Sequence, residues 1–404
     1  MPSHKHKHRG IGIMTGTSLD GIDLVEATFY DAPPMGIKGV EPAPRWVFSI
    51  EQAETVPLPD VWRARLQSLP SQSASVLAQT HVDWGHYLGK TAADWIEQHS
   101  LKPQFVACHG QTIFHQPENG FTTQIGDGET MVSYLKVPLI TQFRNKDVAL
   151  GGQGAPLVPF GERSLFSQHA ALLNLGGIAN LSAGDQAMDV CVCNMALNRL
   201  IRRLLPECTH DVGGQVAASG QIHQALLTQL EAIDWYQTPP PRSLGEEWFE
   251  RTWVPRLDAC QASVPDQLAT LCEHIALRIT DALGLMLPEK RAQSGNMDQA
   301  HGQLTQSTQP DHQPSLLISG GGVHHTHLMQ RLAWHMQDQG LGLKPVVDPV
   351  LTDFKEALIF AFLGLQVLLG RPNVLKSVTG SSGDHLGGSL HLPPGGGWRL
   401  VPQV

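Results

Sequence analysis

Three glycine-rich turns, each placed at the end of an apolar run, constrain this chain of 404 residues more than any other feature. They read MTGTSLDG at 14–21, LNLGGIAN at 173–180 and ISGGG at 318–322. Apolar runs flank the first two turns on both sides, which predicts a β-hairpin over 9–30 and a strand–turn–strand unit over 170–183. Turns without Cβ atoms, with Ser and Thr hydroxyls beside them, suit phosphate oxygens. The three turns together therefore indicate a nucleotide-binding α/β chain.

Two common nucleotide-binding motifs are missing from the sequence. None of the turns has the GxxxxGK[ST] spacing of a P-loop, and no GxGxxG follows the first apolar run. These observations disfavour a Walker-type ATPase and a Rossmann dehydrogenase.

The length predicts two domains, at about 100 to 200 residues per domain. We expect residues 1–136 with 351–404 to form one and 137–350 the other. Residues 289–313 are rich in Gln, Ser, His and Asp, which predicts a solvated surface insertion in the second. Hydrophobic periodicity predicts further elements: two helices within 59–99, a buried strand at 105–110, helices near 193–205, 221–233, 265–287, 325–337 and 357–370, and a strand at 387–392.

Composition and charge restrict the partners of the chain. It is 41% hydrophobic and 16% charged, as in a globular enzyme, and its formal net charge is −9. Without a long basic stripe, nucleic acid and membranes are not expected as partners. Six cysteines in so long a chain fit a reducing compartment. We find neither an export signal nor an apolar run of about 18 residues, so we expect a cytoplasmic protein.

Eight segments resemble the anhydro-N-acetylmuramic acid kinase family, in order and over nearly the whole chain. The most specific is FRNKDVALGGQGAPLVP at 143–159. The others are GTSLDGID (16–23), CHGQT (108–112), QIGDG (124–128), LNLGGIANLS (173–182), SGGG (319–322), EALIFAFL (356–363) and SVTG (377–380). The resemblance implies an α/β, actin-like (ribonuclease H-like) two-domain ATPase/sugar kinase fold, with ATP in an interdomain cleft.

The same resemblance implies a reaction. The family opens the internal ring of 1,6-anhydro-N-acetylmuramic acid with water and phosphorylates O6, using ATP and Mg²⁺, in cell-wall recycling. Such chemistry needs a base to deprotonate water and groups that neutralise the charge of the transferred phosphate. By resemblance, Asp189 in MDVCVCN is the base, and Glu356 is a second active-site carboxylate. Asp20 is suited to hold Mg²⁺ through water.

The resemblance assigns further contacts. His109, Gln111, Arg144 and Asp147 are expected near the sugar, where the planar fork of Arg144 suits its lactyl carboxylate. A homodimer is also implied. The expected ATP contacts lie in the three turns: Gly16, Thr17, Ser18, Leu19, Asp20, Gly21, Ile22, Asp23, Asn174, Gly176, Gly177, Gly320 and Gly321.

Each of these side chains also has a plain structural interpretation. Asp189 suits a turn or a helix start, where a carboxylate caps backbone N–H groups. Asp20 suits a hairpin turn. Glu356 suits the first turn of a helix, and His109 suits a buried structural histidine.

The cysteine and histidine clusters favour structural roles over metal binding. Cys191 and Cys193 have C-x-C spacing and no second pair at zinc spacing, so we expect buried thiols. The clusters HKHKH (4–8) and HHTH (324–327) lack regularly spaced carboxylate or cysteine partners, so we expect them to be solvated.

Residues 190–193, VCVC, depart from the family's TGPG and leave a second function open. A catalytically impaired, actin-like nucleotide-binding sensor or scaffold would retain ATP without altering the sugar. An ordinary hexose-type kinase would add phosphate to its sugar without adding water.

Overall fold

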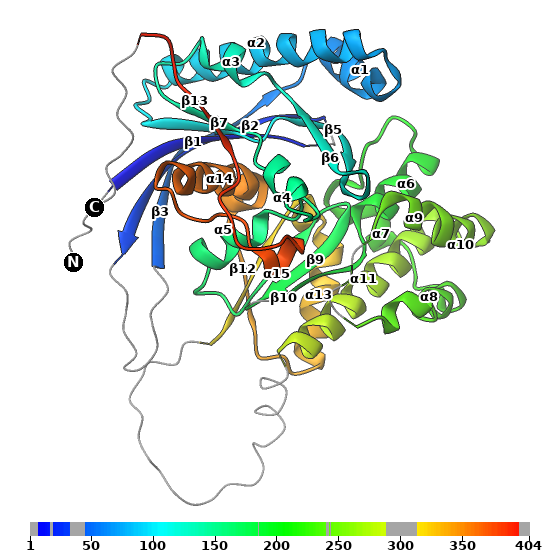
Figure 1. Cartoon of the computed structure of the whole chain (residues 1–404). Coiled ribbons are helices and arrows are strands. Elements are labelled where there is room, and N and C mark those ends of the chain that lie inside the picture. The colour runs from blue at the N-terminus through cyan, green and yellow to red at the C-terminus, as the bar shows by residue number, and fades with distance from the viewer. Residues whose placement is uncertain are drawn as a thin grey trace, which may run out of the picture. The chain divides into compact units, whose positions relative to one another are not determined.

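The computed structural model describes residues 7–16, 19–32, 45–184, 186–239, 242, 244–287 and 313–395. Two compact units divide the chain: Met1–Ser167 with Phe354–Val404, and Gln168–Asp353 (Figure 1). The predicted insertion at 289–313, except for its last residue, lies outside the described residues, as do Thr17 and Ser18.

The first unit contains a six-stranded sheet whose order along the sheet is β13-β7-β4-β1-β2-β3. β1, β2 and β3 are antiparallel, β4 is parallel to β1, and β7 is parallel to β4. The pairing of β1 with β2 confirms the predicted hairpin over 9–30. The strands are β1 (Lys7–Thr15), β2 (Gly21–Ala32), β3 (Arg45–Pro57), β4 (Phe105–Cys108), β7 (Leu139–Thr141) and β13 (Ser389–His391).

Helices of the first unit pack against this sheet and bury their apolar faces on it. The two helices predicted within 59–99 are confirmed as α1 (Asp60–Ser68) and α2 (Ala74–Gln98), and the Ser73 side chain caps α2. Helix α14 (Pro349–Leu368) confirms the buried helix predicted at 357–370 and begins earlier. Gly12 allows close approach, because a Cβ there would lie 1.8 Å from the carbonyl oxygen of Ala357.

Shorter elements of the first unit carry Gln111 and Asp147, two of the residues expected near the sugar. Strands β5 (Gln111–Gln116) and β6 (Phe121–Ile125) form a separate two-stranded sheet. The short helices are α3 (Gly128–Val132), α4 (Asn145–Ala149), α5 (Val158–Leu165) and α15 (Lys376–Thr379).

The second unit repeats the strand order of the first. Its sheet runs β10-β9-β8-β11-β12, with β8, β9 and β10 antiparallel and β11 parallel to both β8 and β12. We count the strands of each sheet in chain order, so that β7 is the fifth strand of the first sheet and β12 the fifth of the second. Both sheets then have the order third, second, first, fourth and fifth. This repeated topology confirms the actin-like (ribonuclease H-like) α/β class. The strands are β8 (Ala171–Leu175), β9 (Ile178–Ala183), β10 (Gln186–Val192), β11 (Ser315–Ser319) and β12 (Lys344–Val347).

Helix α11 (Val264–Met286) forms the centre of the second unit's core, with Leu268, Leu271 and Ile275 fully buried. The helices predicted near 193–205, 265–287 and 325–337 are confirmed, while the one predicted over 221–233 is shorter. The remaining helices are α6 (Asn194–Leu204), α7 (Gln215–Ser219), α8 (Gln224–Glu231), α9 (Glu246–Thr252), α10 (Val254–Ala259) and α13 (Thr326–Asp338).

The division into units differs from the expected domain boundaries. Residues 137–167 belong to the first unit, because β7 joins the sheet of β4 instead of starting a new one. The second boundary falls at 353/354 instead of 350/351, inside α14.

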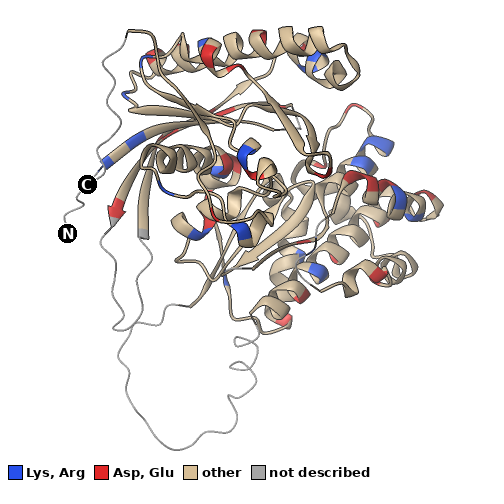
Figure 2. Cartoon of the chain, viewed as in Figure 1, with Lys and Arg blue, Asp and Glu red and all other residues tan. Residues whose placement is uncertain are grey.

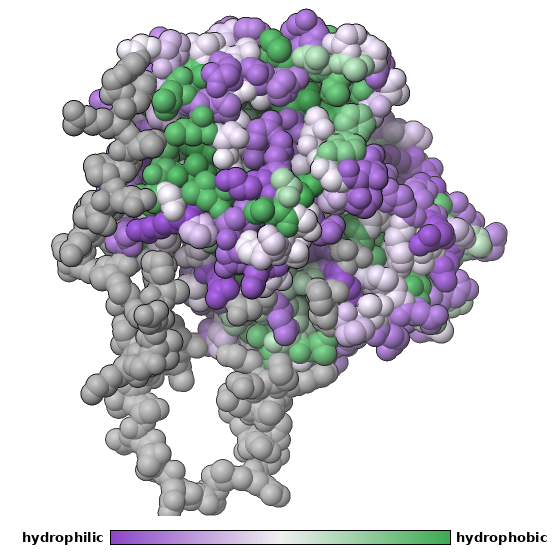
Figure 3. All heavy atoms as spheres, in the orientation of Figure 1, coloured by the Kyte–Doolittle hydropathy of each residue, from purple (hydrophilic) through white to green (hydrophobic). Residues whose placement is uncertain are grey.

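Charges of both signs are mixed along the described ribbons of each unit (Figure 2). Apolar and polar groups are likewise interspersed on the face drawn in Figure 3. Among the described residues, no helix combines the length and apolar character needed to cross a membrane.

Candidate functional site

Asp189 lies in strand β10, immediately before a shift in the pairing register with β9. Its amide donates to the carbonyl oxygen of Arg242 at 2.9 Å, and its Oδ2 accepts from the amide of Leu244 at 2.7 Å. Among the described residues, Oδ1 has no hydrogen-bond partner. The expectation of a turn or helix-start aspartate is wrong, because residue 189 belongs to a strand. One carboxylate oxygen is held by a hydrogen bond, and the other is not held by any described residue.

The environment of Asp189 raises the pKa of its carboxyl group. Burial is the largest cause, opposed by the Leu244 N–H and by the positive charge of Arg242. A raised pKa makes a carboxylate a stronger base, as a group that deprotonates water requires.

Arg242 holds the segment around Asp189 together. Its Nε donates to the carbonyl oxygen of Asp189 at 3.2 Å, and its Nη1 donates to the carbonyl oxygens of Tyr236 and Thr238 at 2.9 and 3.0 Å. The guanidinium also lies over the ring of Trp235, 4.6 Å from its centroid. These contacts keep Tyr236, Thr238 and Arg242 against strand β10.

The four residues after Asp189 belong to the core. Val190, Cys191, Val192 and Cys193 are all fully buried. Burial raises the pKa of the Cys193 thiol to about 12 and that of Cys191 well above its usual range. The prediction of buried thiols is confirmed, and the stiff VCVC sequence is explained by packing.

Two glycine turns of the second unit meet at the ends of β8 and β11. A Cβ on Gly320 would lie 2.5 Å from Oδ1 of Asn174, so this turn needs glycine, which also adopts a φ of 87°. Among the described residues, the amides of Gly176, Gly177 and Gly321 donate no hydrogen bond other than any within helices and strands. Such free amides suit phosphate oxygens.

The carbonyls of the same turn bind the start of helix α6. The oxygen of Gly176 accepts from the amide of Asn194, and that of Gly177 accepts from Cys193 and Met195. The side chain of Asn194 returns to the carbonyl oxygen of Leu175 at 2.8 Å. Asn194 therefore positions this turn, a role that the sequence did not indicate.

The hairpin turn of the first unit exposes one carboxylate. Asp20 is exposed, whereas Ile22 is fully buried and Leu19 is nearly so. Asp23 accepts a hydrogen bond from Thr55 Oγ1 at 2.6 Å, across from it on β3. Of the described side chains in this turn, Asp20 is therefore the one suited to a metal-bound water. Only backbone groups could form hydrogen bonds with a nucleotide at Gly16, Leu19, Gly21 and Ile22.

The buried His109 and the partly buried Arg144 form a hydrogen-bonded pair in the first unit. Arg144 Nε donates to His109 Nε2 at 2.9 Å, so the neutral imidazole carries its proton on Nδ1, which donates to the carbonyl oxygen of Gly110 at 2.8 Å. Burial, followed by the charge of Arg144, lowers the pKa of His109 to about 3. Burial lowers the pKa of Arg144 to about 10, and Glu356 opposes this.

Glu356 lies in the second turn of α14, because the helix begins at Pro349; the expected first-turn role is wrong. Burial raises the pKa of its carboxyl group, opposed by Lys355 and Arg144. Its neighbour Lys355 donates to Glu162 Oε1 at 2.6 Å in a buried ion pair. The sequence did not indicate this pair, which joins α14 to α5.

Asp147 has a structural environment. It is fully buried, and its oxygens accept from the amide of Gly154 and from Thr379 Oγ1, both at 2.6 Å. A Cβ on Gly152 would lie 2.3 Å from Oδ2 of Asp147. These contacts indicate that Asp147 holds the loop 150–157 in place, and they favour this role over direct contact of Asp147 with the sugar. Gln111 is buried too, and its Oε1 has no partner among the described residues.

Two histidines differ from the expected solvated clusters. His8 is buried in β1, with its ring 6.2 Å from that of Trp46. His325 is buried because its Nδ1 accepts from the amide of Leu328 at the start of α13 and its Nε2 faces Asp211. Among the described residues, no group of three or more His, Cys, Asp or Glu side chains is arranged to hold a metal ion.

The repeated sheet topology places the chain in the actin-like (ribonuclease H-like) α/β class. The family model for anhydro-N-acetylmuramic acid kinase matches residues 8–294 and 299–393. The chain therefore belongs to the anhydro-N-acetylmuramic acid kinase family.

Three proteins that carry the family name are similar to this chain over most of its length. The anhydro-N-acetylmuramic acid kinases of Xylella fastidiosa and Pasteurella multocida are each 32% identical to the chain, over 94% and 92% of it and 95% and 93% of their own lengths. That of Pseudomonas syringae pv. syringae is 31% identical, over 94% of this chain and 98% of its own. The crystal structure of ROK hexokinase from Thermus thermophilus aligns with 89% of this chain and 100% of its own, with 11% identity and a TM-score of 0.31.

Proposed function

We propose that this protein hydrolyses the 1,6-anhydro ring of 1,6-anhydro-N-acetylmuramic acid and phosphorylates O6 with ATP, giving N-acetylmuramic acid 6-phosphate. Family membership over nearly the whole chain supports the activity. The observation that carries the mechanism is the carboxylate of Asp189, which has one oxygen held by Leu244 and a raised pKa.

Asp189 acts as the general base. Its Oδ1 accepts a proton from a water molecule, whose oxygen forms a bond to the anomeric carbon as the bond from that carbon to O6 breaks. The released O6 then attacks the γ-phosphorus, and ADP leaves with the bonding electron pair. The proton passes from Asp189 to solvent, so the carboxylate is regenerated.

Arg144 binds the lactyl carboxylate of the acceptor. Its Nε is occupied by His109, and Nη1 donates to the carbonyl oxygen of Gly154 at 2.8 Å, so the Nη2 end remains for the ligand. The guanidinium is therefore locked in place before the sugar arrives, which reduces the entropy lost on binding. Glu356, with its raised pKa, is suited to exchange a proton with the sugar.

The glycine turns bind the phosphates of ATP. The amides of Gly176, Gly177 and Gly321 lie at turns without Cβ atoms, whereas the amide of Gly320 already donates to the carbonyl oxygen of Thr352 at 3.0 Å. The exposed Asp20 fits a Mg²⁺ ion that keeps its water ligands. The ion would neutralise charge on the phosphates.

The alternative function, a nucleotide-binding sensor or scaffold, was suggested by the VCVC sequence at 190–193. These four side chains are fully buried, so core packing accounts for the VCVC sequence. None of them forms a hydrogen bond with Oδ1 of Asp189. Family membership favours the kinase.

The direct experiment is to incubate the protein with ATP, Mg²⁺ and the anhydro sugar and to weigh the sugar by mass spectrometry. A gain of one phosphate plus one water supports the proposal. A gain of phosphate alone would indicate a hexose-type kinase, and an unchanged sugar with bound ATP would indicate a sensor.

We further propose a cytoplasmic location, which the six free thiols support. The homodimer implied by the family is tested by analytical ultracentrifugation of the full chain, and a monomer at all concentrations would reject it.

A further inference from the structure

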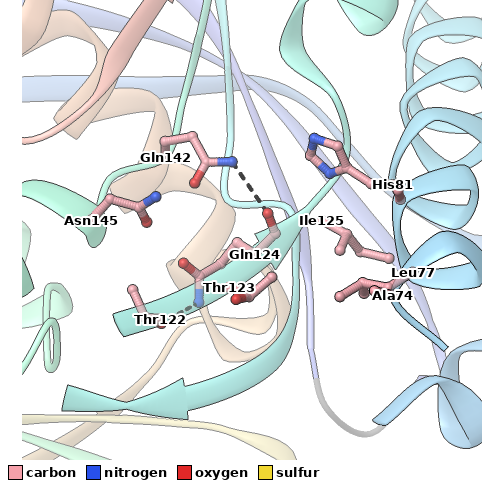
Figure 4. Close-up of a pocket in the computed structure, with 10 residues that line it drawn as sticks. Ala74, Leu77, His81, Thr122, Thr123, Gln124, Ile125, Gln142 and Asn145 are labelled. Atoms are coloured by element: carbon pink, nitrogen blue, oxygen red, sulfur yellow. Dashed lines mark hydrogen bonds between the residues drawn. The ribbon is translucent and has the colours of Figure 1, made fainter. Parts of the chain in front are cut away.

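The hollow in the first unit adjoins the residues proposed for the acceptor sugar. It has a volume of about 350 Å³ and lies between α2, β6 and the residues that follow β7 (Figure 4). Gln124 in its lining donates through Nε2 to Thr112 Oγ1 at 3.2 Å, and Asn145 directly follows Arg144 in the sequence. The side chains stacked around Arg242 in the second unit, in contrast, have no role in the steps above.

Trp235 presents its ring face to the guanidinium of Arg242. The central carbon of the guanidinium lies 4.6 Å from the ring centroid, a cation–π contact. Trp235 is only partly exposed, and the indole of Trp248 lies beside it with ring centroids 5.4 Å apart. Both indoles and Leu244 pack on the core of the second unit. The guanidinium is therefore shielded from water on the side of Trp235.

Tyr236, the next residue, binds the same guanidinium through its backbone. Its carbonyl oxygen accepts from Arg242 Nη1 at 2.9 Å, while Arg242 Nε donates to the carbonyl oxygen of Asp189 at 3.2 Å. Trp235 and Tyr236 both belong to the short 3₁₀ helix η4 (Asp234–Gln237). This single turn therefore holds Arg242 by a ring face and by a carbonyl oxygen, and Arg242 in turn holds the backbone of Asp189.

A buried chain of hydrogen bonds anchors Tyr236. The carboxylate of Glu231 accepts from His274 Nδ1, so the neutral imidazole has its lone pair on Nε2. The Tyr236 hydroxyl therefore donates to His274 Nε2, at 2.9 Å. Burial lowers the pKa of His274, which Glu231 opposes, and burial raises the pKa of Tyr236 well above its usual range. Both groups therefore keep these forms at pH 7, and η4 is fixed to α8 and α11.

We propose that Trp235 is a positioning residue of the proposed reaction, acting on Asp189 through Arg242. This inference rests on the proposed function, in which Asp189 is the base. Trp235 keeps the guanidinium against the carbonyl oxygens that it binds, and so keeps its positive charge beside the carboxylate. Without the ring, water would compete for the guanidinium and weaken these hydrogen bonds.

The test compares Trp235→Leu and Trp235→Phe with the wild type in the phosphorylation assay, over a range of pH. Trp235→Leu should lower kcat about tenfold and change KM by less than about twofold. The acid limb of its kcat/KM profile should move to higher pH by about half a pH unit, because Arg242 lowers the pKa of Asp189 and its charge would move away. Trp235→Phe should lie between, because its ring attracts a cation less strongly.

Trp334→Leu is the matched control in the same unit. Arg331 lies over the exposed Trp334, 4.7 Å from the ring centroid, so this variant removes an equivalent contact away from Arg242. It should keep the wild-type kcat and acid limb. In an active wild type, an unmoved acid limb in Trp235→Leu, or a loss that is equal at every pH, would overturn the proposal.

Hydrogen exchange of the Leu244 amide gives a second measurement that needs no substrate. This amide donates to Asp189 Oδ2, so a loosened Arg242 should speed its exchange at least about fivefold in Trp235→Leu and leave it unchanged in Trp334→Leu. If the wild type makes no product, the proposed function fails, and unchanged exchange then overturns this inference as well. Thermal unfolding checks that each variant is folded, and Trp235→Phe carries both measurements if Trp235→Leu is not.

Discussion

The amide of Leu244 donates a 2.7 Å hydrogen bond to Oδ2 of Asp189, from a position 55 residues further along the chain. This contact holds Oδ2 and fixes the plane of the carboxylate, so Oδ1 is the oxygen to which we assign the proposed role of base. Leu244 therefore sets the orientation of the carboxylate group.

Asp189→Asn should lower kcat for product formation at least 100-fold while ATP binding is kept, because the amide cannot accept a proton but can still accept from Leu244. Product is measured by mass spectrometry and ATP binding by calorimetry. Asp234→Asn, at an exposed aspartate of the same unit, is the control. Turnover within threefold of the wild type would remove Asp189 from the role of base.

Arg242→Ala should reduce kcat more than it changes KM, because Arg242 positions strand β10 through the carbonyl oxygens of Asp189 and Tyr236. Its positive charge also lowers the pKa of Asp189, so its loss should raise that pKa. The base must be deprotonated, so the acid limb of the kcat/KM profile should move to higher pH. A purely structural role would lower activity equally at every pH, and Arg242→Lys should restore part of the shift.

Acid should destabilise the first unit through His109. Its pKa is about 3 in the fold, against an ordinary value near 6.5, so the unfolded chain binds the extra proton between these values. The free energy of unfolding should therefore fall by about 1.4 kcal/mol for each pH unit below 6.5 on account of this group. Urea unfolding at pH 7, 6 and 5 measures the slope. His109→Gln, which can still accept from Arg144, should show a shallower slope; identical slopes would contradict this account.

Lys355→Met should lower the free energy of unfolding by about 3–5 kcal/mol, because it leaves Glu162 charged in a buried site. The double variant Lys355→Met with Glu162→Leu should recover most of this loss. Urea unfolding of the wild type and both variants provides the comparison. If the double variant were as unstable as the single one, the buried pair would not be the source of the effect.

Thr379→Val should destabilise the loop at 150–157 by about 1–3 kcal/mol, because it removes the hydroxyl that donates to the buried Asp147 Oδ1. Hydrogen exchange of this loop should increase, while Thr238→Val, at an exposed threonine, should leave it unchanged. Unchanged protection in Thr379→Val would mean that Asp147 does not hold the loop through this contact.

Local patterns were sufficient to predict much of the fold. The hairpin of β1 and β2 follows from two apolar runs around a glycine turn, and α2 follows from the apolar spacing over 74–98. Strand β10 was missed because Asp189 interrupts a short apolar segment, and only the pairing with β9 shows that the strand continues through it. Likewise, β7 joins a sheet whose other members lie far away in sequence, which moved the domain boundary.

Long-range contacts account for what the sequence could not indicate about the site. Arg242 and Leu244 reach Asp189 across 53 and 55 positions, and Thr379 reaches Asp147 across 232. Residue types identified the possible chemistry, whereas only the fold shows which oxygen of Asp189 is held. Asp211, far away in the sequence, likewise lies beside His325, whose ring accepts locally from the amide of Leu328 at the start of α13.

The most direct measurement of the central claim follows the water. The protein is incubated with ATP, Mg²⁺ and 1,6-anhydro-N-acetylmuramic acid in heavy-oxygen water, and the product is weighed and fragmented. The account predicts one phosphate on O6 and one heavy oxygen on the anomeric carbon, with neither in Asp189→Asn. A phosphorylated sugar without heavy oxygen, or full labelling by Asp189→Asn, would contradict it.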